Sequence, residues 1–187
     1  IKQKSIQHDL SLKHQEWLIK NFNNVEAHTL NLDKLFDEFK SSLSKFDNDH
    51  GMANSRARLR MTTLYQVAAA NKGIVVGTGN KVEDFGVGFY TKYGDGGVDI
   101  SPIADCNKTE IWELGKELGI LQEIIDAAPT DGLWDDGRTD EGQLGLKYQE
   151  LEEAMKNPNS PNRDKYELIR KQNLHKMEPI PVCKIPN

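Results

Sequence analysis

Apolar residues in the first part of the chain recur mostly at helical spacing. They predict helices over Asp9–Phe22, over 32–43 and over about Ala53–Asn71. Residues 25–30 instead alternate apolar and polar side chains, which is typical of a short strand. We therefore expect one strand among three helices in this region.

A short apolar run between glycines follows at Gly73–Thr78. It predicts a buried parallel strand, because both of its faces are apolar. A short extended segment is expected over 98–103. It is followed by a helix that is capped by Asn107 or Thr109, runs through Leu118 and stops at Gly119. Helix, buried strand and glycine-rich turn in this order indicate an open α/β sheet. Ligands of such sheets bind beyond the carboxyl ends of the strands, so residues 77–99 are the predicted binding region.

The last third of the chain combines a loop, two helices and a proline-rich end. A polar loop is expected over 129–142, and helices over 148–155 and 162–173. Three prolines between 179 and 186 exclude a helix there, because proline lacks an amide donor and has a fixed φ. The length of 187 residues is that of one domain.

Charge and hydropathy exclude several classes of protein. With 24 basic and 29 acidic residues, the net charge of −5 argues against a general nucleic-acid partner. Eight acidic residues against two basic ones between 130 and 153 account for most of the excess. Residues 163–187 carry six basic residues against three acidic ones, so an anionic ligand can still meet a local positive field. The longest aliphatic runs have about four residues, whereas a membrane span needs about 20, and no transmembrane helix is expected.

The cysteines indicate the redox compartment, the histidines bear on metal binding, and the first residue bears on processing. Cys106 and Cys183 lie far apart and form no CxxC motif, which fits a reducing cytoplasm. The five histidines form no zinc-binding pattern, although a hard cation bound by a carboxylate stays open. The chain opens at Ile1 without a signal sequence, and we interpret Ile1 as a cut end.

Three short segments carry candidate chemistry. Gly77-Thr78-Gly79 at a strand end can present backbone N–H groups and a hydroxyl to a ligand, or it is an ordinary tight turn. It is neither a Rossmann fingerprint nor a P-loop. On the predicted third helix Arg56 and Arg60 share a face and Arg58 points elsewhere, and such arginines either hold phosphate or carboxylate or are solvated. The glycine-rich turn 94–97, flanked by lysine and aspartate, favours ligand binding. These residues alone predict an α/β domain that binds a phosphorylated small molecule.

A longer string identifies a family. Residues Gly77–Glu83 and the sequence GFYTKYGDGGVD at Gly88–Asp99 resemble the ammonia-dependent NAD synthetase family. Supporting motifs occur in the family's order, at Asn54–Met61, Asn107-Lys108, Ala128–Thr130, Thr139–Glu141 with Leu144-Gly145, and His175-Lys176. The resemblance covers about residues 50–180. It implies a three-layer open parallel sheet with helices on both faces, of the Rossmann-like adenine nucleotide alpha hydrolase type.

The resemblance also implies a reaction and a set of site residues. Deamido-NAD would be adenylated by ATP and then amidated by ammonia, giving NAD, AMP and pyrophosphate, with Mg²⁺ as cofactor. It further implies a cytoplasmic homodimer. ATP would contact Thr78, Lys108 and Thr130, Mg²⁺ would bind Glu83, and deamido-NAD would contact Arg58, Lys92, Asp99, His175 and Lys176. Lys108 and Asp99 are the implied catalytic residues, the first for phosphate charge and the second near the nicotinate end.

Departures from the family pattern leave alternatives open. The family's Ser-Gly-Gly-x-Asp-Ser loop, which binds pyrophosphate, is absent from these 187 residues. We therefore expect residues 1–187 to be the larger C-terminal part of one synthetase domain, lacking its first strand. Residues 79–82 read Gly-Asn-Lys-Val where many members carry Asp-His-Ala-Ala. With no glutaminase module, ammonia would be free or come from another chain. The alternatives are an inactive binding or dimerisation remnant, or another ATP pyrophosphatase such as a GMP-synthetase relative.

Overall fold

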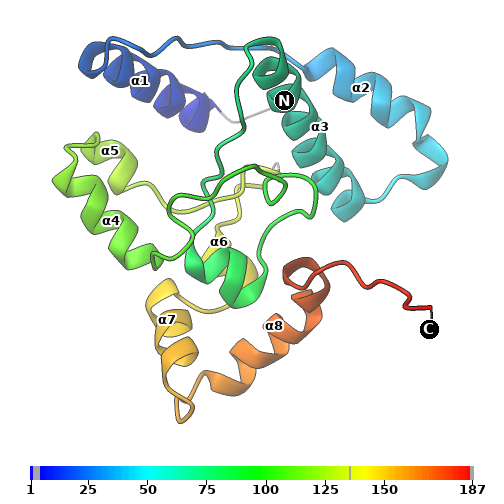
Figure 1. Cartoon of the computed structure of the whole chain (residues 1–187), viewed down its shortest axis with the longest axis vertical. Helices are drawn as coiled ribbons and strands as arrows, with labels where there is room; N and C mark the ends of the chain where they lie inside the picture. The colour runs from blue at the N-terminus through cyan, green and yellow to red at the C-terminus, as the bar shows by residue number, and fades with distance from the viewer. Residues whose placement is uncertain (2–4, 135, 186–187) are drawn as a thin grey trace.

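The computed structural model describes residues 1, 5–134 and 136–185, and this part of the chain is mainly helical (Figure 1). The elements are α1 (Ser5–Asn21), α2 (Asp33–Ser42), the 3₁₀ turn η1 (Ser44–Phe46), α3 (Asp49–Ala70), the π-helix η2 (Lys81–Val87), α4 (Lys108–Glu117), α5 (Gln122–Ile125), α6 (Asp140–Leu144), α7 (Tyr148–Lys156) and α8 (Arg163–Met177). In Figure 1, α1, α2 and α3 lie at one end, α7 and α8 at the other, and α6 between them.

The predicted helices are present, with shifted ends. Helix α3 begins earlier than predicted because the side chain of Asn48 accepts a hydrogen bond from the Gly51 amide at 2.8 Å and caps it. Helix α4 follows Asn107, one of its two predicted caps, and the chain turns at Gly119, whose φ of 67° suits glycine. Helix α8 extends past its predicted end to Met177. Short helix α6 occupies the end of the predicted 129–142 loop, and neither η2 nor α5 was predicted.

The strand predicted at 25–30 is wrong. This segment is extended, its side chains are mostly exposed, and it has no regular strand structure. Within the described residues, the β pairing is a single parallel bridge between Val76 and Ile100. An alternating pattern makes a strand only where a neighbouring strand supplies hydrogen-bond partners, and residues 25–30 have no such neighbour in this part of the chain.

The segment 73–78 is extended and parallel to its neighbour, but only partly buried. The Gly77 amide donates to the Ile100 carbonyl at 2.7 Å, and the Asp99 amide donates to the Val75 carbonyl at 3.0 Å. Val75 is 6% exposed, whereas Ile74 and Val76 are 58% and 54% exposed. The expectation that both faces are dry is therefore wrong for the described residues, since Ile74 and Val76 stay largely exposed although Val76 pairs with Ile100. The larger open sheet remains a prediction.

The main hydrophobic core lies between η2, α7 and α8. Its buried members are Val82, Val87, Leu144, Leu146, Tyr148, Leu151, Ala154 and Tyr166. Arg170 ties α8 to η2 by donating hydrogen bonds to the carbonyls of Phe85 and Gly86. This packing fixes η2, which carries Glu83, against α7.

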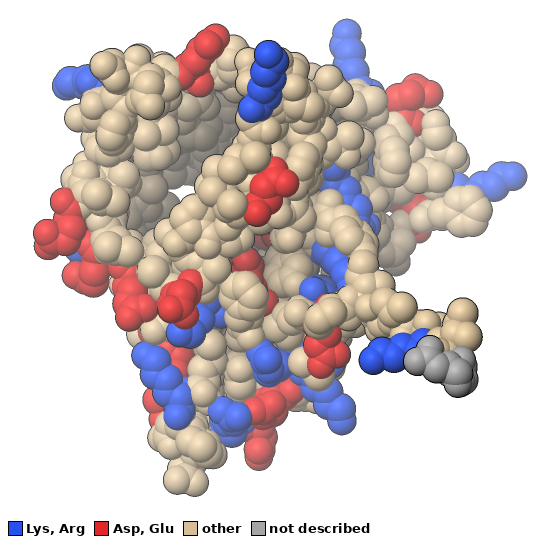
Figure 2. Space-filling model, viewed as in Figure 1, with Lys and Arg blue, Asp and Glu red and all other residues tan. Residues whose placement is uncertain are grey.

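Charged side chains of both signs lie on the surface of α7 and α8. On the face in Figure 2, basic and acidic side chains are interspersed over α7 and α8, without an unbroken positive patch.

Residues 179–185 are not helical, as predicted, and Pro186 lies outside the described residues, as does Asp135 of the acidic segment. Among the described helices, none is both long and apolar enough to cross a membrane.

Candidate functional site

The π-helix η2 orients Glu83. Before it, the Asn80 side chain accepts hydrogen bonds from the amides of Val82 at 3.0 Å and Glu83 at 3.1 Å, which caps the element. At its other end Gly88 adopts a left-handed φ of 67°. π-Helical turns occur frequently at functional sites, because the wider turn changes where side chains point. Here the turn directs Glu83 towards the first residue of α4.

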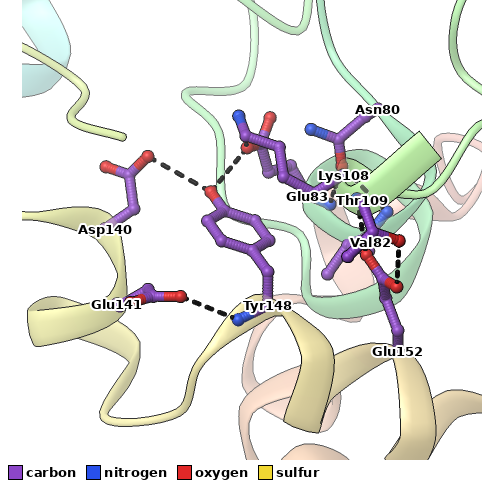
Figure 3. A network of polar contacts seen from close by, with 9 residues as sticks. All are labelled: Asn80, Val82, Glu83, Lys108, Thr109, Asp140, Glu141, Tyr148 and Glu152. Carbon is purple, nitrogen blue, oxygen red and sulfur yellow. Dashed lines mark hydrogen bonds and ion pairs between the residues drawn. The ribbon is translucent and has the colours of Figure 1, made fainter. Parts of the chain in front are cut away.

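Glu83 and Lys108 form a half-buried ion pair with a tyrosine beside it (Figure 3). Lys108 Nζ lies 2.9 Å from Glu83 Oε1, and the side chains are 19% and 15% exposed. The Tyr148 hydroxyl donates to the same oxygen at 2.6 Å. Lys108 Nζ also lies 5.0 Å from the centre of the Tyr148 ring. Two residues assigned to ATP and Mg²⁺ through family resemblance are thus adjacent in the fold.

Asp140 lies on the other side of the Tyr148 hydroxyl. It is 6% exposed, and its Oδ2 is 3.2 Å from the hydroxyl oxygen. Burial, followed by the charges of Glu83 and Asp131, raises the pKa of Asp140 to about 6. Because the hydroxyl has one proton and donates it to Glu83, the contact with Asp140 is best satisfied when Asp140 is protonated and donates to Tyr148.

The carboxylates fit a magnesium ion only in part. In the part of the chain that the structure describes, no group of three or more His, Cys, Asp or Glu residues is arranged to hold a metal ion. Mg²⁺ in nucleotide sites is commonly held by one or two carboxylates together with phosphate oxygens and water. Glu83 therefore suits one ligand position of an ion whose remaining ligands come from a nucleotide.

A cavity of about 580 Å³ opens between α3, residues 75–78, residues 88–91 and α8, and its lining includes neither Glu83 nor Lys108. Thr78 and Lys176 line it, together with Arg60. Lys176 Nζ donates to the carbonyls of Gly88 at 2.9 Å and Tyr90 at 2.8 Å, and burial lowers its pKa. This volume falls within the range of small-molecule sites. Its walls carry the cations Arg60 and Lys176 and also the acids Asp95 and Asp131, among many apolar side chains. Such a mixed lining suits a ligand with both polar and aromatic or sugar parts.

Three residues assigned to deamido-NAD also meet. Arg58 Nε donates to the Lys92 carbonyl at 3.1 Å, and Lys92 Nζ donates to the His175 carbonyl at 2.7 Å. The chain places Lys176 next to His175. Segments separated widely in sequence, on α3, after η2 and on α8, thus meet through hydrogen bonds to backbone carbonyls.

Asp99 and Thr130 form hydrogen bonds with residues other than Glu83 and Lys108. Asp99 Oδ2 accepts from the Val75 amide at 2.7 Å, and its Oδ1 accepts from the Tyr65 hydroxyl at 3.3 Å. Thr130 donates to the Arg138 carbonyl at 3.2 Å. No contact joins either residue to the Glu83–Lys108 pair among the described residues.

Sequence reasoning missed the residues that support Glu83. Tyr148 belonged only to a predicted helix, and Asp140 only to a family string. Asn80 was noted only as a departure from the family pattern. The usable signal was the position of Tyr148 close behind the Thr139–Glu141 and Leu144-Gly145 motifs, in a helix with an apolar face.

Sequence comparisons find one family of similar proteins. Residues 2–185 match the sequence model described as NAD synthase. The chain is 42% identical over 142 residues to the NH(3)-dependent NAD(+) synthetase of Carboxydothermus hydrogenoformans, covering 74% of this chain and 58% of that protein. It is 38% identical over 177 residues to the enzyme of the same name from Alkaliphilus metalliredigens, covering 92% and 66%. The chain therefore spans less than two thirds of these relatives.

Two solved structures are similar to this chain. The NMN synthetase from Francisella tularensis superposes with a TM-score of 0.86 at 31% identity, covering 99% of this chain and 74% of that one. The NH3-dependent NAD synthetase from Campylobacter jejuni gives a TM-score of 0.65 at 23% identity, covering 86% and 67%. The second likeness bears on the fold alone. Both are consistent with the α/β Rossmann-like class that the sequence predicts.

Proposed function

The chain belongs to the NAD synthase family, and on that premise we propose that it serves the ATP-dependent amidation of deamido-NAD with ammonia. The observation that supports this most directly is the Glu83–Lys108 ion pair, whose side chains are only 15% and 19% exposed. A carboxylate and an ammonium group at 2.9 Å can neutralise, respectively, a divalent cation and a phosphate when a nucleotide arrives. We further propose a cytoplasmic homodimer, as the family resemblance implies.

The first step activates a carboxylate. A nicotinate carboxylate oxygen attacks the α-phosphorus of ATP, the bond from that phosphorus to the bridging oxygen breaks, and pyrophosphate leaves. Negative charge grows on the leaving phosphates, and we assign its stabilisation to Lys108, with Thr78 and Thr130 at the nucleotide. Mg²⁺, when bound, supplies further neutralisation, and Glu83 would be its protein ligand. Positioning and charge stabilisation carry most of the catalysis in such steps.

The second step forms the amide. Ammonia attacks the carbonyl carbon of the mixed anhydride, the carbon–oxygen bond to AMP breaks, and the nitrogen loses a proton. We assign Asp99 to this end of the substrate, where its negative charge favours the positive charge on the attacking nitrogen. Arg58, Lys92, His175 and Lys176 would bind the dinucleotide phosphates and ribose. The hydrogen bonds that join Arg58, Lys92 and His175 through backbone carbonyls support this assignment.

A second substrate is favoured by one comparison. The Francisella protein, which covers 99% of this chain in superposition, is called an NMN synthetase. The same chemistry on a mononucleotide acid would give NMN instead of NAD. Such a substrate would lack the AMP half and would need fewer of the basic contacts.

The test is turnover by the chain with ATP, Mg²⁺, ammonium and either acid. We expect AMP to form together with the amide, faster with deamido-NAD than with nicotinic acid mononucleotide. A preference for the mononucleotide would select the second candidate, and stabilisation by xanthosine monophosphate instead of either acid would select a GMP-synthetase relative. No AMP with any acid would refute the proposed activity and leave the binding or dimerisation remnant.

Variants on one helix sharpen this test. Lys108→Ala should lower AMP formation by about tenfold or more, because it removes a charge-assisted contact to phosphate. Lys116→Ala is the matched control, since Lys116 lies on the same helix and its side chain is 51% exposed. Equal activity of the two variants would remove Lys108 from the mechanism.

A further inference from the structure

Tyr148 connects the two charged groups of the site to the core. Its side chain is fully buried, and its ring packs edge-on against Trp112 with centroids 6.1 Å apart. Its hydroxyl donates to Glu83 Oε1 at 2.6 Å, and its ring lies under Lys108 Nζ at 5.0 Å. One immobile side chain therefore contacts both partners of the ion pair.

The acidic motif at 139–141 holds Tyr148 at both of its ends (Figure 3). Glu141 Oε1 accepts from the Tyr148 backbone amide at 3.0 Å. Asp140 Oδ2 lies 3.2 Å from the hydroxyl at the far end of the ring. The Thr139 side chain accepts from the Gly142 amide at 3.1 Å and starts the helix that carries both acids. These three residues thus act together on one aromatic side chain.

We propose that Tyr148 is a positioning residue that fixes Glu83 and Lys108 in their working geometry, and that Asp140 and Glu141 hold it in place. The inference rests on the proposed function for its catalytic meaning. Because Tyr148 occupies one direction at Glu83 Oε1, the carboxylate is restrained from rotating about its terminal bond, and its second oxygen keeps one orientation. Lys108 is confined between that carboxylate and the ring face. Such preorganisation avoids reordering charged groups when the nucleotide binds.

The direct test is the chemical reactivity of Lys108, which does not require turnover. Competitive acetylation of the folded chain by acetic anhydride is read by mass spectrometry, with Lys116 as the exposed internal reference. Tyr148→Phe keeps the ring and removes the hydroxyl. We expect the Lys108-to-Lys116 labelling ratio to rise by about tenfold, because Glu83 loses a hydrogen bond to a charged group and the ion pair opens more often.

The control is Tyr166→Phe. Tyr166 is 5% exposed, belongs to the same core cluster and contacts Arg163 instead of Glu83. It should leave the labelling ratio unchanged. A ratio in folded Tyr148→Phe within about twofold of the original protein would overturn the proposal, since losing a contact of this kind should have a larger effect.

Asp140 provides a second route if Tyr148→Phe does not fold. Asp140→Asn retains an amide donor that reaches the Tyr148 hydroxyl, whereas Asp140→Leu has similar size and no polar group. The proposal expects higher Lys108 labelling in Asp140→Leu and restoration in Asp140→Asn. Equal labelling of the two variants would overturn it.

Turnover separates this inference from the proposed function. If the original chain forms AMP, Tyr148→Phe should lower kcat by about tenfold and leave the KM for deamido-NAD unchanged. If the original chain forms no AMP, the proposed function fails, and the labelling ratio still decides whether Tyr148 holds the pair.

Discussion

Replacing Asp140 by asparagine should change how the stability of the chain depends on pH. Burial, with the charges of Glu83 and Asp131, raises the pKa of Asp140 from 3.8 to about 6 in the folded chain. The folded state therefore binds the Asp140 proton more tightly than the unfolded state does. The stabilising contribution of Asp140 to the free energy of unfolding is lost as the pH rises from about 4 through about 6. Asparagine does not titrate and resembles the protonated acid in shape.

The magnitude follows from the two pKa values. Each pKa unit corresponds to about 1.4 kcal/mol, so keeping Asp140 ionised in the folded chain costs at most about 3 kcal/mol above pH 7. Between about pH 4.5 and about pH 7.5 the cost grows by about 2 kcal/mol, because unfolded Asp is already mostly ionised at the lower pH. The stability of Asp140→Asn relative to the original chain should rise by this amount over the same interval.

Urea unfolding followed by circular dichroism at both pH values measures the effect. The pKa of Asp84 is also raised to about 6, mainly by burial, but Asp84 titrates in both proteins and largely cancels in the difference. Equal m-values would show that the unfolding transition itself is unchanged. An Asn-minus-Asp difference that is the same at both pH values would refute the argument that burial and neighbouring charges raise the pKa of Asp140.

Three further changes test the packing around the site by the same unfolding assay. Asn80→Ala removes the cap of η2 and should cost about 1 kcal/mol, and no loss would contradict the capping role. Leu151→Ala should cost about 2–5 kcal/mol because Leu151 is fully buried in the core, whereas Leu168→Ala, at a residue 58% exposed, should change the stability by less than about 1 kcal/mol. Gly88→Ala should destabilise the chain by about 1–3 kcal/mol, because φ is 67° there and a Cβ would lie 2.6 Å from Asn173 Cβ. A neutral result would show that η2 can end without a left-handed residue.

Local signals predicted most helices but few of their tertiary partners. Apolar spacing predicted α1, α2, α3, α7 and α8, because apolar residues recur at helical intervals in each of them. The same reasoning failed at residues 25–30, where an alternating pattern has no neighbouring strand in the described chain. It also missed η2, because a π-helix depends on a cap and on packing against α7 and α8 instead of on a repeating pattern.

In the candidate site, too, the sequence identified individual residues but not all of the contacts that support them. Family resemblance selected Glu83 and Lys108, and the structure brings them to 2.9 Å. It also selected Arg58, Lys92 and His175, which the structure joins through backbone carbonyls. The supporting role of the Tyr148 hydroxyl was missed, because the position of Tyr148 behind the acidic motif does not show which residue it contacts until α7 packs against η2. Residues that support a site through the core leave little trace in a single sequence.

The edge-on contact between Trp112 and Tyr148 gives the site an intrinsic optical reporter. The indole and the phenol rings are 6.1 Å apart, so the fluorescence of Trp112 senses the side chain that touches Glu83 and Lys108. The other two tryptophans are Trp17 on α1 and Trp134 in the loop before α6. Replacing both by phenylalanine would leave one tryptophan, and a stopped-flow trace of its intensity would then follow movement of the Tyr148 side chain in real time without any added label.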